Sequence, residues 1–218
     1  MTAETAVPDG AVSPLSAYAE RLADVEVRSG GALALAEVPF TSMVNLRLDS
    51  LGSESSPTLG VLGIDRMPLT GQVVHGGDLR VLGLGPDEWL VVGPSGASGV
   101  LVGDLRSSLT KALGRGAWSV VDVSAARTTI AVTGPSALDA LAHGCALDLD
   151  PRHFGPGVRT QCAQTMLARA QVVLVAFDGP DPEPGVEILV RSSFAGYLAD
   201  WLLDAAAELT SGQAGDGS

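Results

Sequence analysis

Residues 118–149 limit the fold more than any other part of the chain, because two strand patterns, a turn and a short helix follow one another there. Segments 118–123 and 128–132 are apolar and rich in β-branched residues, which predicts two strands. A Gly-Pro pair at residues 134–135 then ends the second strand and suits the start of a helix, since the fixed φ of proline fits the first helical turn. Gly144 predicts the end of that helix in a left-handed conformation. The segment is therefore expected to form a strand–strand–helix unit.

Strand and helix patterns alternate along the rest of the chain. Apolar alternation predicts strands, and apolar residues three and four positions apart predict helices. The predicted strands are 33–35, 44–48, 80–84, 89–92, 186–190 and a Val/Leu strand within 166–177, and the predicted helices are 18–25, 100–113 and a final helix to residue 209. Ser192 or Ser193 is expected to cap the final helix, whose apolar face carries Phe194, Leu198, Trp201, Leu202, Ala205 and Leu209. Strand pairs followed by helices, seen twice, predict an α+β fold with a mixed, largely antiparallel sheet and helices on one face.

Length and composition favour one globular domain. The chain has 218 residues, of which 46% are hydrophobic, and this is enough for a sizeable core. Both ends are small, polar or Gly-rich. We therefore expect a disordered segment at 1–13, a single domain over 14–209, and a disordered tail at 210–218.

Charge and hydropathy exclude two classes of partner. Thirteen basic residues against 25 acidic residues give a net charge of −12, and no basic stripe marks a nucleic-acid surface. No apolar run approaches the roughly 18 residues that a membrane span requires. The first residues also lack the basic start and apolar core of a signal peptide, so a cytoplasmic location is expected. In that compartment cysteines are expected to stay reduced.

The glycines of residues 93–99 invite a comparison with phosphate-binding loops, because they lie between a strand and a helix. Their spacing is Gly-x-x-Gly-x-x-Gly and differs from the dinucleotide fingerprint Gly-x-Gly-x-x-Gly. Pro94 also removes one of the backbone N–H groups that a phosphate would need. A plain connection is the favoured interpretation.

Potential metal ligands and nucleophiles gather between residues 143 and 162. His143, Cys145, His153 and Cys162 match none of the usual paired zinc-ligand spacings. Neither cysteine lies at a helix start or in a cationic cluster that would activate a thiolate. We expect His143 to meet the last carbonyls of a helix and Cys145 to act as a small core residue. No catalytic, cofactor-binding or metal-binding residue is therefore predicted.

Paired carboxylates give no better candidate for catalysis. Asp148 and Asp150 lie at the entry to a loop, and residues 87–88 lie in a turn. Solvated or capping roles are common for carboxylates at such places. We expect those roles here.

Four residues are predicted to form either a partner interface or a structural clamp. Asp122 and Arg127 flank a strand corner, where polar groups need partners, and they are expected to pair as a buried clamp in preference to binding a ligand. Trp89 and Trp201 are candidates for an interface because aromatic residues are enriched at interface hot spots. In a chain with 4% aromatic residues they could equally fill the core.

Four blocks in order resemble the gamma subunit of heterotetrameric sarcosine oxidase. They are AEVPFTSMVNLRLDS at 36–50, RVLGLGPDEWLVVGP at 80–94, VVDVSAARTTIAVTGPSALDALAHGCALDLDP at 120–151 and VEILVRSSFAGYLADWLLDA at 186–205. The resemblance extends over roughly residues 32–205, and its specificity comes from the order of the blocks, since none is a catalytic fingerprint. It implies kinship with the folate-binding domain of glycine-cleavage aminomethyltransferases and the α+β fold of that domain.

The resemblance also implies a function in an assembly. Such a chain is an accessory, non-catalytic subunit beside alpha, beta and delta subunits, which carry FAD, FMN, NAD, tetrahydrofolate and zinc. The assembled enzyme oxidises sarcosine to glycine with release of hydrogen peroxide and transfers the methyl carbon to tetrahydrofolate. In the folate-using relatives an Asn-Ala stretch and an acidic residue follow the strand that resembles 89–92, whereas Gly-Pro-Ser follows it here. A stand-alone folate-dependent aminomethyl transferase and a non-enzymatic binding domain are the alternatives.

Overall fold

The computed structural model describes residues 10–49, 58–114, 116–178 and 184–213. Contacts between these residues group into two compact units. The first unit is built on Phe40–Ala126, and the second is built on Val12–Pro39 together with Arg127–Ser218. The second unit is therefore formed from two separate stretches of the sequence.

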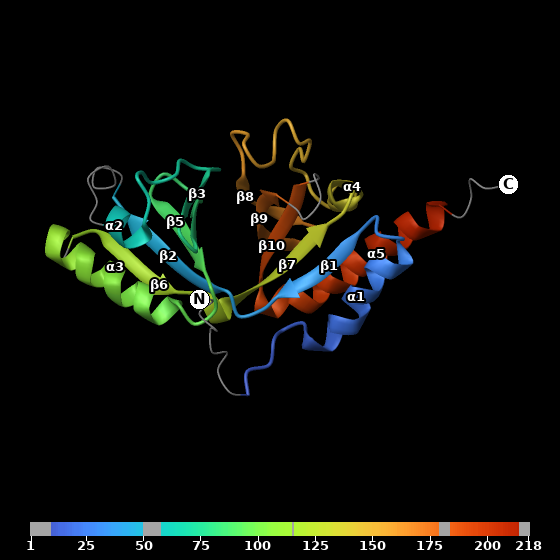
Figure 1. Cartoon of the computed structure of the whole chain (residues 1–218), viewed down its shortest axis with the longest axis horizontal. Coiled ribbons are helices and arrows are strands. Elements are labelled where there is room, and N and C mark those ends of the chain that lie inside the picture. The colour runs from blue at the N-terminus through green and yellow to red at the C-terminus, as the bar shows by residue number, and fades with distance from the viewer. Residues whose placement is uncertain (1–9, 50–57, 115, 179–183, 214–218) are drawn as a thin grey trace. The chain divides into compact units, whose positions relative to one another are not determined.

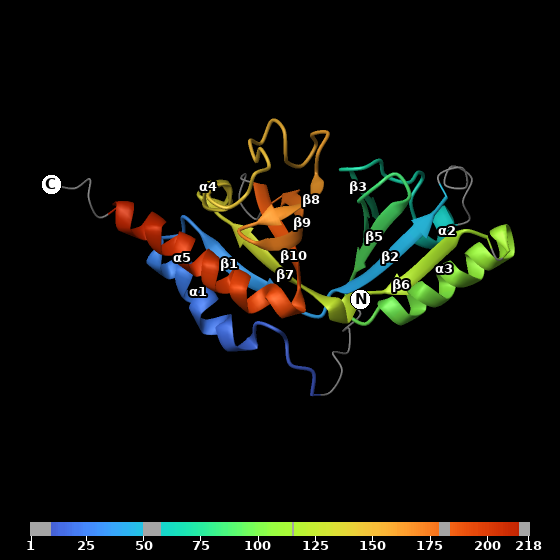
Figure 2. The same ribbon diagram turned by 180° about the vertical axis from the view of Figure 1, so that it is seen from behind.

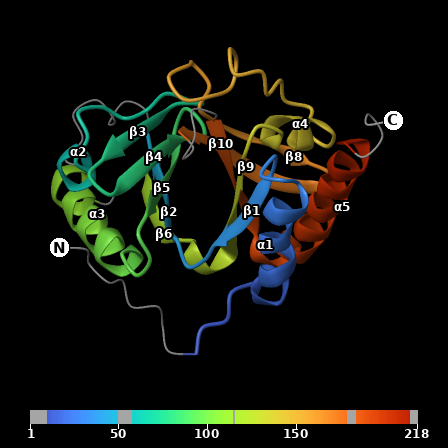
Figure 3. The ribbon, with the colours of Figure 1, turned by 45° about the vertical axis from the view of Figure 1, so that its right-hand side comes forward.

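The first unit is a five-stranded sheet with two helices (Figure 3). Its elements are β2 (Ser42–Leu48), α2 (Thr58–Leu62), β3 (Val73–Gly76), β4 (Leu79–Gly83), β5 (Glu88–Gly93), α3 (Ser98–Leu113) and β6 (Trp118–Asp122), with a 3-10 turn at Ser124–Ala126. The strand order is β3-β4-β5-β2-β6, and each neighbouring pair is antiparallel.

Alternation along the strands and helical spacing explain the core of the first unit. Trp89 and Val91, two residues apart on β5, lie in the same buried cluster, since alternate residues of a strand point to the same face. Leu101, Leu105 and Leu109 of α3 are spaced by four residues and enter the same cluster. The predicted helix at 100–113 and the predicted strands at 80–84 and 89–92 therefore meet in one core.

The second unit is a second five-stranded sheet, with its helices packed together on it (Figures 1 and 2). Its elements are a 3-10 turn at Ser16–Tyr18, α1 (Ala19–Arg28), β1 (Ala34–Val38), β7 (Arg127–Thr133), α4 (Ala137–Ala142), β8 (Cys162–Leu167), β9 (Ala170–Asp178), β10 (Pro184–Arg191), a 3-10 turn at Ser192–Phe194, and α5 (Ala195–Gln213). The strand order is β1-β7-β10-β9-β8, again with antiparallel neighbours.

Helices α1, α4 and α5 supply the helical side of the second core. Leu22 of α1, Leu141 of α4 and Leu198 of α5 are all fully buried in one cluster with the sheet. Outside this core, α1 and α5 are joined by an ion pair, since the Arg21 guanidinium lies 3.1 Å from the Asp200 carboxylate. Both partners are more than half exposed, so packing stabilises the helix pair far more than this ion pair does.

The glycine predicted to break the chain after the second strand has a specific packing role. Gly134 has a φ of +101°, and a Cβ on it would lie 2.7 Å from the carbonyl oxygen of Ala32. That carbonyl accepts a hydrogen bond from the Ser136 N–H at 2.9 Å. Only glycine allows this approach at that φ. Helix α4 starts directly afterwards, with Ser136 as its N-cap residue.

The predicted α+β class and its antiparallel, helix-covered sheet are confirmed, although the strands form two sheets and not one. The Val/Leu strand expected within 166–177 is confirmed as β9, and a hairpin turn at Ala168, which has a φ of +53°, joins it to β8. Strands β3 and β8 and helix α2 were not predicted.

The predicted domain limits stay a prediction in most respects. Of the end segments expected to be disordered, residues 1–9 and 214–218 lie outside the described residues. Helix α5 continues to Gln213, past the predicted limit at 209. Among the described helices, none has the length and apolar character needed to cross a membrane.

We predict opposite effects of alanine at two glycines of the first unit. A Cβ on Gly83 would overlap the backbone carbonyl of Leu69, whereas a Cβ on Gly103 in α3 meets nothing within 4 Å. Gly83→Ala should lower the free energy of unfolding by about 1–3 kcal/mol, because backbone atoms must move. Gly103→Ala should raise it by about 0.5–1 kcal/mol, because alanine is the better helix former. Urea denaturation of both variants measures this, and a Gly83→Ala variant as stable as the parent contradicts the close packing.

Candidate functional site

Trp89 lies in the core of the first unit. Its side chain is 3% exposed, and the indole Nε1–H donates a hydrogen bond to the Pro68 carbonyl at 2.9 Å. The ring is thus buried within the unit, and its N–H group has a hydrogen-bond partner there. Of the two roles predicted for this tryptophan, the structure places it in the one that fills volume.

Asp122 acts as a local cap at the end of β6. Its carboxylate accepts hydrogen bonds from the Ser124 hydroxyl at 2.6 Å and from the Ser124 N–H at 2.9 Å. Burial opposes ionisation, but these bonds and one from the Ser98 side chain outweigh it and hold the pKa of Asp122 below its ordinary value. Asp122 belongs to the first unit and Arg127 to the second, so their pairing as a clamp stays a prediction.

The start of α3 is occupied by the chain's own polar groups. The Ser98 N–H donates to the Ser42 hydroxyl at 3.1 Å, and the Ser98 side chain bonds to the Asp122 carboxylate. The Ser42 hydroxyl and the Asp122 carboxylate thus both lie beside the first residue of α3. The interpretation of residues 93–99 as a plain connection stays a prediction.

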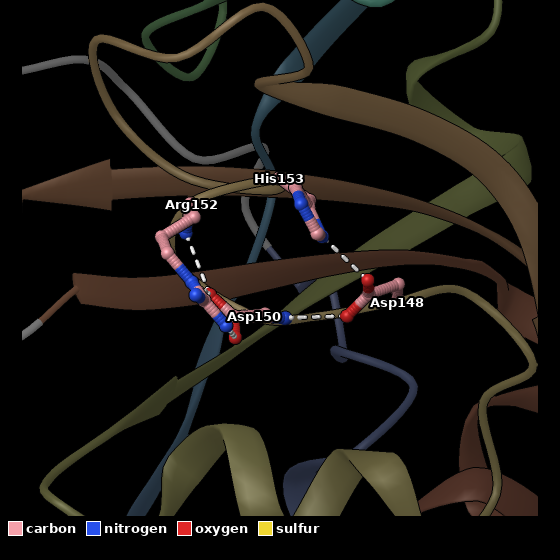
Figure 4. A network of polar contacts seen from close by, with 4 residues as sticks. All are labelled: Asp148, Asp150, Arg152 and His153. Atoms are coloured by element: carbon pink, nitrogen blue, oxygen red, sulfur yellow. Dashed lines mark hydrogen bonds and ion pairs between the residues drawn. The ribbon is translucent and has the colours of Figure 1, made fainter.

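A polar network orders the loop between α4 and β8 (Figure 4). Asp150 holds the Arg152 guanidinium through two bonds, at 2.9 Å to Nε and 2.6 Å to one terminal nitrogen. His153 Nδ1 lies 2.5 Å from Asp148, whose other carboxylate oxygen accepts the Asp150 N–H at 3.1 Å. The two carboxylates therefore have the capping roles expected of them.

Electrostatics and burial give this network a structural role. The Arg152 side chain and then its N–H hold the pKa of Asp150 well below its usual range, and the Asp150 N–H together with His153 lowers the pKa of Asp148. The backbone N–H of Phe154 donates to the Asp150 carbonyl at 2.9 Å. Phe154 is 1% exposed and enters the second core. The network thus shapes the loop that inserts this phenylalanine.

The histidines and cysteines that were considered as metal ligands have separate structural surroundings. His143 Nδ1 lies 2.8 Å from the Asp139 carbonyl, the helix-end contact expected of it. Cys162 is fully buried in β8, whereas Cys145 is partly exposed and packs against the second core. In the part of the chain that the structure describes, no three His, Cys, Asp or Glu side chains are grouped as a metal site would need.

Trp201 borders a shallow surface groove of the second unit. We call this the α4–α5 groove, and its lining residues are Ala142, His143, Gly144, Cys145, Ala168, Arg169, Tyr197 and Trp201. They come from the end of α4, the β8–β9 turn and one face of α5. Trp201 is half-buried and packs against the second core, while Tyr197 one turn earlier is 45% exposed. Trp201, one of the four residues predicted for an interface or clamp, thus lies beside a groove.

Gly144 holds the three walls of the groove together. Its carbonyl accepts the Ala168 N–H at 2.9 Å, which ties α4 to the β8–β9 turn. A Cβ at Gly144 would overlap the Trp201 ring. Glycine is therefore required for the Trp201 side chain of α5 to pack against the chain at residue 144. Gly144 does not have the left-handed conformation predicted for a helix stop, and close packing explains this glycine instead.

An aromatic residue at the start of the final helix was predicted to lie on its buried face, but the structure places it differently. Phe194 was placed on the buried stripe of the final helix, yet it is 46% exposed. Over residues 195–208, where the burial of this helix is described, the buried residues are Ala195, Leu198, Ala199, Leu202 and Ala206. Tyr197 and Trp201 of α5 therefore lie beside the buried stripe, at a spacing of four residues that puts them on one face. Phe194 ends the 3-10 turn just before this helix. Such a surface offers aromatic and cationic contacts to another molecule.

Comparison with known proteins gives the family. The model of the sarcosine oxidase gamma subunit family matches residues 56–208. A protein of Corynebacterium sp. (strain U-96) named sarcosine oxidase subunit gamma is 31% identical and covers 92% of each chain. One of the same name from Corynebacterium sp. (strain P-1) is 33% identical over 91% of each chain.

Solved structures agree with the family. A chain of heterotetrameric sarcosine oxidase from Corynebacterium sp. U-96, solved with pyrrole 2-carboxylate, matches with a TM-score of 0.76 and 31% identity, covering 92% of this chain and 96% of that one. The glycine cleavage system aminomethyltransferase T from Bartonella henselae matches with a TM-score of 0.60, 17% identity and 84% coverage of this chain, which amounts to 48% of that protein. The second likeness shows the fold alone.

We predict that the Asp122 cap stabilises the first unit in a pH-dependent way. The lowered pKa means that its contribution is complete above the unfolded-state pKa of about 3.9 and is lost as pH falls through the folded value. In a double-mutant cycle, Asp122→Asn and Ser124→Ala should be coupled at pH 7, and the coupling should shrink at about pH 3. Urea midpoints of the four proteins measure it. Equal coupling at both values would show that the carboxylate charge is not involved.

Proposed function

The chain belongs to the sarcosine oxidase gamma subunit family, and we propose that it acts as the accessory, non-catalytic gamma subunit of a heterotetrameric sarcosine oxidase. The observation that carries the proposal is the extent of the likeness. This chain resembles its relative in sequence and in fold over nine-tenths of both chains, since the structural match covers 92% of this chain and 96% of that one. The likeness thus extends over nearly the whole length of that relative.

The use of the polar residues supports a role without chemistry. Asp122 caps a strand end, Asp150 holds Arg152, and His143 meets a helix carbonyl. A catalytic acid, base or nucleophile needs a free functional atom beside a position for substrate. These groups are instead bonded to the chain itself, and the groove that borders Trp201 is shallow and open.

The proposed assembly is an oxidoreductase in which other chains hold the reactive groups. It would oxidise sarcosine to glycine with formation of hydrogen peroxide and transfer the methyl carbon to tetrahydrofolate. Alpha, beta and delta subunits are the proposed partners, and they would hold FAD, FMN, NAD, tetrahydrofolate and zinc. The proposed location is the cytoplasm.

We predict that this chain co-purifies with its companion subunits and is inactive alone. Co-expression of the four chains, with a tag on this one, should give a complex in which it is present in one copy per assembly. That complex should consume oxygen when sarcosine is added. The isolated chain should elute colourless from gel filtration and release no peroxide from sarcosine, because among the described residues Asp122, Asp150 and His143 are bonded to the chain itself.

Two results would contradict the proposal. A flavin that stays with the isolated chain through gel filtration would make the chain a cofactor carrier. A chain that never joins the companion subunits, and binds tetrahydrofolate alone, would be a stand-alone folate protein. The matched control is the same co-expression with the tag moved to a companion subunit, which should recover this chain in equal amount.

A further inference from the structure

The α4–α5 groove concentrates side chains that are scarce in this protein. The chain has only three tryptophans and two tyrosines, and the groove uses one of each, Trp201 and Tyr197. Tryptophan and tyrosine dominate binding energy at interfaces because they bury large areas at small entropic cost. Exposed Phe194 ends the 3-10 turn just before α5, three residues before Tyr197. An aromatic surface of this kind is costly to leave in water.

The charge of the groove is opposite to that of the protein. The ionisable side chains that border it besides Tyr197 and Cys145 are His143 and Arg169, and no carboxylate is among its lining residues. Three other surface hollows each contain carboxylates, namely Asp24 and Asp204, Asp104, and Asp49 and Asp87. On a chain of net charge −12, a carboxylate-free groove with a guanidinium at its edge selects for an acidic partner.

The groove is also preformed. Its walls are joined by the hydrogen bond from Ala168 to the Gly144 carbonyl and by the packing of Trp201 on Gly144. The backbone of Cys145 also forms an isolated antiparallel β-bridge with Leu167, at the end of β8. A rigid surface loses little entropy when a partner binds, so its contacts convert efficiently into affinity.

We propose that the α4–α5 groove docks a segment of a companion subunit that carries an apolar side chain flanked by Asp or Glu. The apolar side chain packs on Tyr197 and Trp201, and the carboxylates meet Arg169. The inference rests on the proposed function, because the family works as a subunit of a larger assembly. A second copy of this chain is the competing occupant, and it would appear as self-association.

Cys145 gives a direct test, since it lines the groove while the other cysteine is fully buried in β8. In the isolated native chain a maleimide should modify one thiol, Cys145, and a second only after unfolding. In the assembled complex Cys145 should be protected about tenfold or more, as expected for a residue inside a stable interface. A cysteine placed at Val27, which is 79% exposed on α1, should react equally in both states in a Cys145→Ser background.

Paired substitutions test the chemistry of the occupant. Tyr197→Ala and Arg169→Glu should each weaken binding of this chain to the companion subunits about tenfold or more, as hot-spot and charge-reversal changes do. Val27→Ala and Arg159→Glu are the matched controls at exposed positions of the same unit and should leave binding unchanged. Melting temperatures of the isolated variants, expected to stay within the range of the controls, separate lost contacts from a lost fold.

The outcomes are distinguishable. If the complex forms and Cys145 reacts in it as fast as in the free chain, the groove is not the docking surface, although the subunit role stands. If Cys145 is protected only at high concentration of the isolated chain, with a doubled mass, the occupant is a second copy and the proposal is overturned. If no complex forms, this inference and the proposed function both fail.

Discussion

The second unit depends on one long-range strand pair, in which β1 (Ala34–Val38) runs antiparallel to β7 along Thr129–Thr133. The pair closes a sheet between stretches of chain that are separated by the whole first unit. Closing so long a loop costs entropy, which the buried apolar residues of both strands must offset. Gly134 makes the end of this pair possible, because it lets β7 approach the Ala32 carbonyl, and Ser136 then bonds to the same oxygen.

The groove follows from this anchoring. Once Ser136 is fixed, α4 runs from Ala137 to Ala142 and delivers Gly144 to the ring of Trp201 on α5. The β8–β9 turn joins them through its bond to the Gly144 carbonyl. Three segments that are distant in the sequence thus meet at one surface, which is aromatic and free of carboxylates on an acidic protein. The proposed accessory role needs a surface of this type.

Local patterns predicted most elements, because apolar periodicity depends on neighbours along the chain. The β4–β5 hairpin and α3 were found this way, and the family was found from ordered blocks. The division into two sheets was not predicted, because the preference of β7 for β1 and β10 is set by long-range packing and leaves no trace in periodicity.

Single positions were also missed. The turn at Ala168 lacked a glycine to mark it, although its φ is positive. Gly144 was assigned a conformational role because the proximity of Trp201 is invisible in sequence. The exposed position of Phe194 was missed for the same reason, since an aromatic beside a buried stripe is normally taken as part of it.

Hydrogen–deuterium exchange tests most directly whether this chain works by being bound and not by binding a small molecule. The amides of the free chain would be compared with those of the chain in the assembled complex, and with those of the free chain plus sarcosine or tetrahydrofolate. The account predicts slower exchange in the complex at the end of α4, at the β8–β9 turn and along the Tyr197–Trp201 face of α5, and no change with either small molecule. Slower exchange of the isolated chain upon addition of sarcosine or tetrahydrofolate, without any change on assembly, would contradict it.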